Sequence, residues 1–179
     1  MTNAAKRLAL LTAIMVYPGL ASAATPGTLG ATSTGSVDIS ATVPARVQIS
    51  GLNDVAFGTV DPATAASSAQ DLCVWSNTVG RTYDITATGS GAASAFTLSD
   101  GSNLLSYSVE WGADAGLSSG SAFTPGTSLN GLASAATDAT CSSGPAASAS
   151  LIVKMTAADM QAAVASSYTG TLTLVVAPR

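Results

Sequence analysis

Residues 35–44 read GSVDISATVP, and this stretch decides how the rest of the chain is interpreted. Four apolar residues alternate in it with small or polar ones, which is the period of a half-buried β-strand. They are Val37, Ile39, Ala41 and Val43. Pro44 ends the pattern, because proline has no backbone N–H to give to a sheet. The pattern predicts a strand over 36–43, and it leaves open whether this strand joins its own sheet or that of another molecule.

Most of the other apolar stretches are also short, and turn-forming residues separate them. They predict further strands at 46–51, 54–60, 71–77, 82–89, 95–101, 104–111, 149–155 and 168–178. Residues 112–148 are rich in Gly, Ser and Ala and are expected to be mostly loop. A short helix is expected within 156–166, with Thr156 as its N-cap. Many short strands at such spacing are typical of an all-β sandwich or barrel.

The first 23 residues have the three parts of a secretory signal peptide. These parts are the cations Lys6 and Arg7, the apolar stretch 8–16, and the cleavage motif Ala21-Ser22-Ala23. The alternative, an uncleaved membrane anchor, is disfavoured because the apolar stretch is too short to span a bilayer. The sequence therefore predicts export through the Sec pathway to the periplasm. Removing 23 of 179 residues leaves a mature chain of 156, enough for one domain.

The mature chain is expected to have three parts. Residues 24–34 are polar, contain Gly and Pro, and are expected to form a flexible leader. The patterned strand occupies 35–44. The remaining strands, over 45–179, would form a single sandwich domain with its own core.

Charge and residue types exclude several functions. Ten acidic residues stand against four basic ones after residue 23, a net charge of −6. The basic residues are Arg46, Arg81, Lys154 and Arg179, too scattered to form a basic patch, so no nucleic-acid partner is expected. The chain has no histidine, so neither a Ser-His-Asp nor a Cys-His site can be built.

The remaining candidates for chemistry have simpler interpretations. Alternation places Lys154 on the solvent face of its strand, where it opposes edge aggregation. Asp61, Asp100 and Asp138 stand beside turn residues, where a carboxylate accepts hydrogen bonds from the turn backbone. No pair of acids suggests a glycosidase and no calcium loop is present. We therefore expect no enzyme activity, no cofactor and no metal.

The two cysteines, Cys73 and Cys141, lie 68 positions apart. In an oxidising compartment an even pair without metal-type spacing is most simply one disulfide. Two free buried thiols or a metal site are the alternatives, although zinc is disfavoured because the chain has neither histidine nor a C-x-x-C motif. Trp75 and Trp111 are expected in the core, and the alternative is a surface platform that stacks on a sugar ring.

The mature sequence resembles the subunits of bacterial chaperone–usher pili, nearest the spore coat U-like (archaic) and alpha-type subunits. The resemblance rests on the exported start, on GSVDISATVP, and on three later stretches: LCVWSNT with YDITATG, LLSYSVEWG, and SSYTGTLTLVVAP at 166–178. Subunits of this family have an immunoglobulin-like sandwich that lacks its last strand. A periplasmic chaperone lends them a strand, and the N-terminal segment of the next subunit later replaces it.

The resemblance implies a role for each end of the mature chain. Val37, Ile39, Ala41 and Val43 would be the donor residues, and Leu172, Leu174 and Val176 would line the strand beside the acceptor groove. The partners would be identical or related pilin subunits, a periplasmic chaperone and an outer-membrane usher. The product would be a cell-surface fimbrium that supports adhesion or biofilm formation. The alternative is a stand-alone secreted sandwich that binds carbohydrate or protein, with 36–43 paired in its own sheet.

Overall fold

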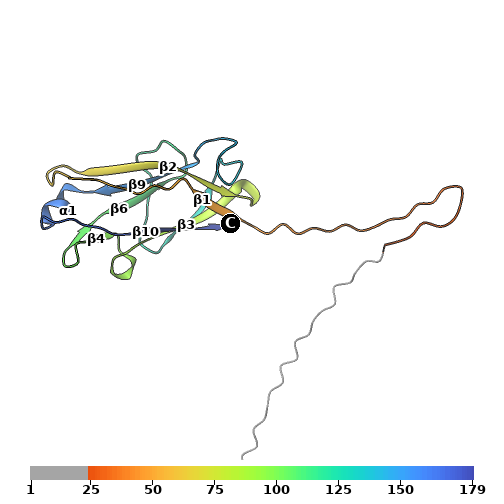
Figure 1. Ribbon diagram of the computed structural model, residues 1–179, viewed down its shortest axis with the longest axis horizontal. Helices are drawn as coiled ribbons and strands as arrows, with labels where there is room; N and C mark the ends of the chain where they lie inside the picture. Colours follow the sequence, from red (N-terminus) through yellow and green to blue (C-terminus); the bar gives the residue numbers. More distant parts are fainter. Residues whose placement is uncertain (1–23) are drawn as a thin grey trace, which may run out of the picture. The chain divides into compact units, whose positions relative to one another are not determined.

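The computed structural model of the protein describes residues 24–179, so the expected signal peptide lies outside the described residues. The chain divides into two units, the first ending at Val43 and the second spanning Pro44–Arg179 (Figure 1). No helix within 24–179 is long and apolar enough to cross a membrane.

In the first unit, Thr25 and Ser36 exchange two backbone hydrogen bonds of 2.9 Å and so close residues 25–36 into a loop. Residues 37–43 follow with exposed side chains and belong to no sheet; Ile39 is 90% exposed. The strand expected over 36–43 is therefore not formed in the single chain. The alternation is present, but a strand exists only where a neighbour accepts its hydrogen bonds.

The second unit is an antiparallel β-sandwich of the immunoglobulin-like class. Its larger sheet has the order β1-β2-β9-β6-β7 and its smaller sheet the order β10-β3-β8. The larger sheet consists of β1 (Val47–Ser50), β2 (Ala66–Ser76), β9 (Ala149–Met155), β6 (Ser108–Gly112) and β7 (Ser121–Ala122). The smaller sheet consists of β10 (Leu172–Pro178), β3 (Thr82–Gly89) and β8 (Ser128–Ala133).

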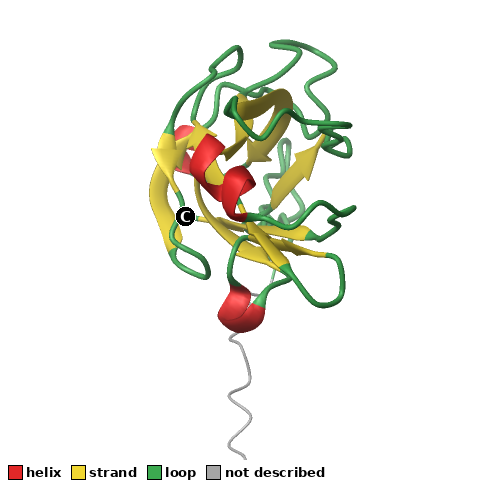
Figure 2. Cartoon of the chain, turned by 90° about the vertical axis from the view of Figure 1, so that its left-hand side faces the viewer, coloured by secondary structure: helices red, strands yellow, loops and turns green. Residues whose placement is uncertain are grey.

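The remaining elements are short, and the helical ones are drawn in red in Figure 2. Strands β4 (Thr97–Ser99) and β5 (Leu104–Ser106) form a separate hairpin. The helix α1 (Ala157–Ala162) begins at Thr156, whose hydroxyl accepts the N–H of Asp159 as an N-cap, so the expected helix is confirmed. Two 3-10 turns span Val79–Arg81 and Ala92–Ser94.

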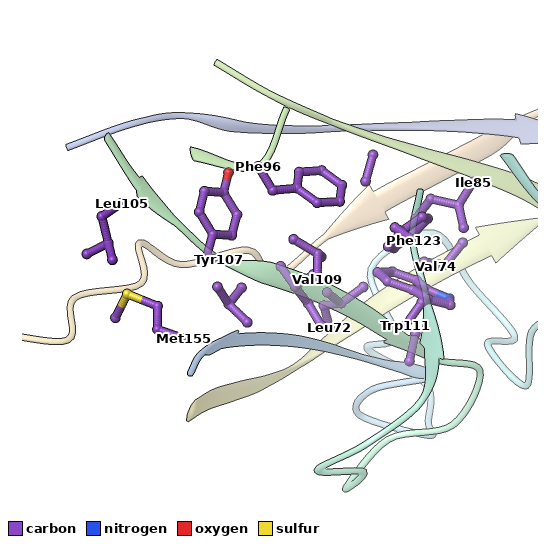
Figure 3. Close-up of a cluster of buried hydrophobic side chains, with 14 of the residues drawn as sticks. Leu72, Val74, Ile85, Phe96, Leu105, Tyr107, Val109, Trp111, Phe123 and Met155 are labelled. Atoms are coloured by element: carbon purple, nitrogen blue, oxygen red, sulfur yellow. The ribbon is translucent and has the colours of Figure 1, made fainter. Parts of the chain in front are cut away.

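The core lies between the two sheets, and alternating residues of both fill it (Figure 3). The larger sheet contributes Leu72, Val74, Val109, Trp111, Leu151 and Val153, and β3 contributes Tyr83, Ile85 and Ala87. Trp111 is 2% exposed and packs edge-on against Phe123, so its expected core position is confirmed. Trp75 is only half-buried and packs with Cys73 and Cys141 in a second cluster. The alternation of β2 explains this difference, because Trp75 shares a face with Cys73 and not with Val74.

Several expected strand bounds were wrong. Residues 54–60 form no strand, because Gly51 at φ 81° ends β1 and the segment then runs without a sheet neighbour. The expected strand 104–111 is two strands, β5 and β6, which pair with different partners. In the expected loop 112–148 the structure contains β7 and β8, whose few apolar side chains gave no alternating signal.

The indole of Trp111 provides a test of the core. Its Nε1–H donates to the hydroxyl of Tyr83 at 3.0 Å, and both side chains are buried. Tyr83→Phe leaves this donor without a partner, so we expect a loss of about 1–3 kcal/mol in the free energy of unfolding. Urea denaturation measures it. The matched control is Tyr107→Phe, whose hydroxyl makes no hydrogen bond within residues 24–179 and whose loss should stay below about 0.5 kcal/mol.

The three turn acids accept backbone hydrogen bonds as expected, and Asp138 does so most extensively. The N–H groups of Ser143 and Thr140, at 2.7 and 3.0 Å, hold the pKa of its carboxyl well below the usual value. A carboxyl whose folded-state pKa is depressed stabilises the fold above its unfolded pKa of about 4, and this stability is lost as the pH falls.

Asp138→Asn should therefore destabilise the protein at neutral pH, and the difference from wild type should shrink as the pH falls below about 4. Urea denaturation across pH measures this. Asp114→Asn is the control, because the Asp114 carboxylate accepts no hydrogen bond from residues 24–179. A difference for Asp138→Asn that stays constant with pH would contradict the assignment.

Candidate functional site

The last strand, β10, has one apolar face toward the core and one exposed face. Leu172, Leu174 and Val176 are half-buried and pack against the core, whereas Thr173 and Val175 between them are exposed. The alternation follows directly from the sequence TLTLVVA, in which leucine or valine occupies every second position. The three residues expected to line an acceptor strand therefore lie together on its inner face.

Strand β10 is also the edge of its sheet. All seven of its residues pair with β3, from Leu172 opposite Gly89 to Pro178 opposite Tyr83. No described strand pairs with its other side. In an antiparallel pair the N–H and C=O groups of alternate residues point away from the partner, so β10 presents a row of free backbone groups along this edge.

An apolar groove lies beside this free edge. Its two walls are residues 52–57 and residues 170–174. The base is formed by apolar core side chains: Leu98, Tyr107, Leu151, Val153 and Met155. Figure 3 shows Tyr107 and Met155 among the core side chains at this end of the sandwich. The groove thus opens directly onto the core, where a closed sandwich would have another strand.

The wall opposite β10 is the segment that was expected to be a strand over 54–60. Its side chains still alternate, with Val55, Phe57 and Val60 half-buried and their neighbours exposed. Residues 54–60 make no backbone–backbone hydrogen bond within the described chain. The segment is held at one end by Gln70, whose side-chain amide exchanges hydrogen bonds of 2.8 and 3.0 Å with the backbone of Asn53. Both walls of the groove therefore carry unpaired backbone groups.

The groove continues past β10 toward α1. A second hollow shares Val55, Phe57, Leu98 and Met155 with the first. Beyond them it is bounded by Leu105, by Met160 of α1, and by residues 163–168. Strands β1 and β10 also lie close to each other. The two hollows together form an apolar channel that extends from Leu172 and Leu174 of β10 to α1.

The volume of the two hollows, about 520 and 610 Å³, does not by itself identify the occupant. Pockets for small molecules span about 300–1,000 Å³ and combine apolar walls with a few converging polar groups. Here the polar groups are backbone groups on two facing walls. An extended peptide satisfies such groups along its length and places alternate side chains in the base. The chemistry of the groove therefore fits a β-strand better than a small ligand. No cluster of potential metal ligands occurs within 24–179.

Three charged side chains lie at the end of β10 or in the groove lining. At the far end of β10, Arg179 Nη1 lies 3.1 Å from Asp84 Oδ1 on β3. The N–H of Gly131 also donates to Asp84 at 2.7 Å, and this bond, with Arg179 beside it, lowers the pKa of the carboxyl. Asp54 lines the other end of the groove, together with Leu172. The charge of Arg179 at the end of β10 is therefore paired with that of Asp84, whereas the carboxylate in the lining of the groove is that of Asp54.

The other sequence-predicted residues lie elsewhere. Cys73 and Cys141 form the expected disulfide, on the outer face of β2 and away from the groove. The four expected donor residues belong to the first unit. Lys154 points outward as expected and also pairs with Glu110 at 2.8 Å. The sequence analysis did not identify the role of Gln70, and it wrongly expected a strand over 54–60. The signal against that strand was the pair Gly51 and Gly58, both at positive φ, because glycine within a strand pattern often marks a break in it.

No family model matches the chain, and no curated protein matches it. Among solved structures, one similar chain belongs to a chaperone–tip adhesin complex of CFA/I fimbriae. It is 20% identical over 75% of this chain and 41% of the other, with a TM-score of 0.45. Another belongs to the CsuC–CsuE chaperone–tip adhesion subunit pre-assembly complex from archaic chaperone–usher Csu pili of Acinetobacter baumannii. It is 18% identical over 75% of this chain and 40% of the other, with a TM-score of 0.41. The chain thus spans about two fifths of the length of both.

Proposed function

We propose that this protein is a structural subunit of a chaperone–usher pilus, and that it polymerises by donating residues 35–44 to the groove of another subunit. The observation that carries the proposal is the groove itself, an apolar channel between two walls of unpaired backbone. Such an edge promotes aggregation if it stays open, so a protein that keeps one needs an occupant. A donated strand satisfies the backbone of both walls at once.

The first unit has the properties that a donor needs. Its four apolar residues alternate over seven positions, and three of them are large and exposed. The exposed fractions are 67% for Val37, 90% for Ile39 and 81% for Val43. Exposed aliphatic residues at this density indicate a surface that is buried in an assembly. Burying them at about 1.5–3 kcal/mol each contributes about 5–9 kcal/mol before entropy costs, as an upper bound.

The donation runs from one copy to the next and does not close on itself. Each copy carries one donor segment and one groove, so the contact is heterologous and produces a fibre. On this proposal a periplasmic chaperone fills the groove before assembly, an outer-membrane usher exports the subunit, and the product is a cell-surface fimbrium. Adhesion or biofilm formation would be the result of the fibre, and the protein itself would carry no enzymatic activity.

A peptide test distinguishes this function from that of a stand-alone binding module. A chain lacking residues 24–43 keeps its groove and has no donor, so a synthetic peptide of residues 34–45 should bind it and raise its unfolding midpoint. The same peptide with Ile39→Asp should not. If the wild-type protein instead remains a stable monomer without a chaperone, and the peptide leaves the midpoint unchanged, the pilus proposal fails and the secreted binding module is favoured.

A further inference from the structure

We propose that Asp38 of one copy pairs with Arg179 of the next, and that this charge pair selects the direction in which the donor strand enters the groove. The inference rests on the proposed function, since it concerns the same groove. The apolar pattern alone does not define the direction. Val37, Ile39, Ala41 and Val43 are evenly spaced, so either orientation places four apolar side chains toward the core.

The faces of the two strands decide which donor residues can meet which groove residues. Along β10 the odd positions, including Thr173 and Val175, are exposed on the outer face. Arg179 continues this face, and its guanidinium pairs there with Asp84. When the odd donor residues point inward, Asp38 points outward. Asp38 and Arg179 therefore lie on the same face of the completed sheet.

The antiparallel orientation brings this pair together. The register that sets Ile39, Ala41 and Val43 opposite the three half-buried residues of β10 places Val43 opposite Leu172 and Val37 opposite Pro178. It places Asp38 opposite Ala177 and diagonally next to Arg179. Diagonal neighbours in an antiparallel pair are about 7–8 Å apart at the backbone, within reach of a long side chain.

The parallel orientation separates the same two charges. Asp38 would then lie near Thr173, six residues from Arg179, which is about 20 Å along a strand. It would also lie at the end of the groove that Asp54 lines. One direction therefore brings Asp38 to Arg179, and the other keeps these two charges apart.

Arg179 has the capacity for a second partner. Its side chain is 54% exposed, and only Nη1 contacts Asp84. A guanidinium has five N–H donors in a planar fork, so one face can serve Asp84 and another an incoming carboxylate. Asp84 in turn keeps the hydrogen bond from Gly131, so its charge is not left without a partner.

Charge reversal in the full mature chain tests the pair. Asp38→Arg and Arg179→Asp should each slow polymer growth about three- to tenfold, and the combined variant should grow about threefold faster than Arg179→Asp alone. The effects should diminish in high salt. Asp114→Arg, an exposed loop residue, is the control for net charge and should grow at the wild-type rate. A combined variant that grows no faster than Arg179→Asp would overturn the pair.

Two pairs of introduced cysteines test the direction of the donor strand by cross-linking, independently of charge. Thr42→Cys with Thr173→Cys should cross-link neighbouring copies into a disulfide ladder, because these positions are opposite in the antiparallel register. Thr42→Cys with Ala177→Cys should not, because that pair is opposite only in the parallel orientation. The reverse result would overturn the proposal while leaving the pilus function intact. If the wild-type chain formed no polymer, the pilus function would fail and the charge pair with it.

Discussion

Ile39→Asp in the full-length chain is expected to abolish polymer formation while leaving each subunit folded. The side chain is 90% exposed in the single chain, so the substitution removes no intramolecular contact of consequence. In a completed groove the same position would face the core. Replacing isoleucine there removes about 3 kcal/mol of binding free energy from apolar burial, and the new carboxylate adds the cost of desolvating a charge. A combined loss above about 4 kcal/mol weakens donation about a thousandfold.

Ser40→Asp is the matched control for this prediction. It introduces the same charge one residue along the same exposed segment, on the face that would point to solvent. We expect polymers at close to the wild-type level for Ser40→Asp and none for Ile39→Asp. Electron microscopy of surface fibres and size-exclusion chromatography of the purified protein measure both. Equal polymer yields from the two variants would show that the face of the segment does not matter, and the donor assignment would be wrong.

The sequence predicted best the strands in which apolar alternation coincides with β-branched residues. Strands β3 and β9 match their expected bounds because 82–89 and 149–155 combine apolar alternation with β-branched residues. Alternation also correctly identified the inner face of β10. In these elements local propensity and tertiary burial favour the same conformation.

The sequence was less informative where a neighbour is missing or packing is weak. Residues 36–43 and 54–60 have strand patterns and no strand, because periodicity records which face would be buried and not whether a partner is present. Strand β8 is the opposite case, a strand without a strand pattern. Its sequence SLNGLA shows little alternation, and it forms because β3 provides an edge to pair with. The inner face of β10 could therefore be predicted from the sequence, whereas the unpaired state of the segment on the other side of the groove could not.

Removing the disulfide, by Cys73→Ala with Cys141→Ala, is expected to lower the free energy of unfolding by about 4 kcal/mol. The bond joins β2 to the loop that follows β8, across a sequence separation of 68 residues. Closing a loop of this length restricts the unfolded chain, which accounts for about 4 kcal/mol in the chain-entropy model. For a domain of this size that is a large share of a total stability of about 5–15 kcal/mol.

The native contacts of the loop allow the entropic and local effects of this substitution to be separated. Ser134 and Ser148 both donate hydroxyl hydrogen bonds to the carbonyl of Val74, so the two ends of the loop stay attached to β2 without the disulfide. We therefore expect the double-alanine variant to keep its fold, and urea denaturation to show a lower midpoint with an altered slope, because the unfolded state becomes less compact. The reduced wild-type protein should show the same loss. A decrease below about 1 kcal/mol would mean that the loop is fixed by its hydrogen bonds, and that the disulfide contributes little beyond covering Trp75.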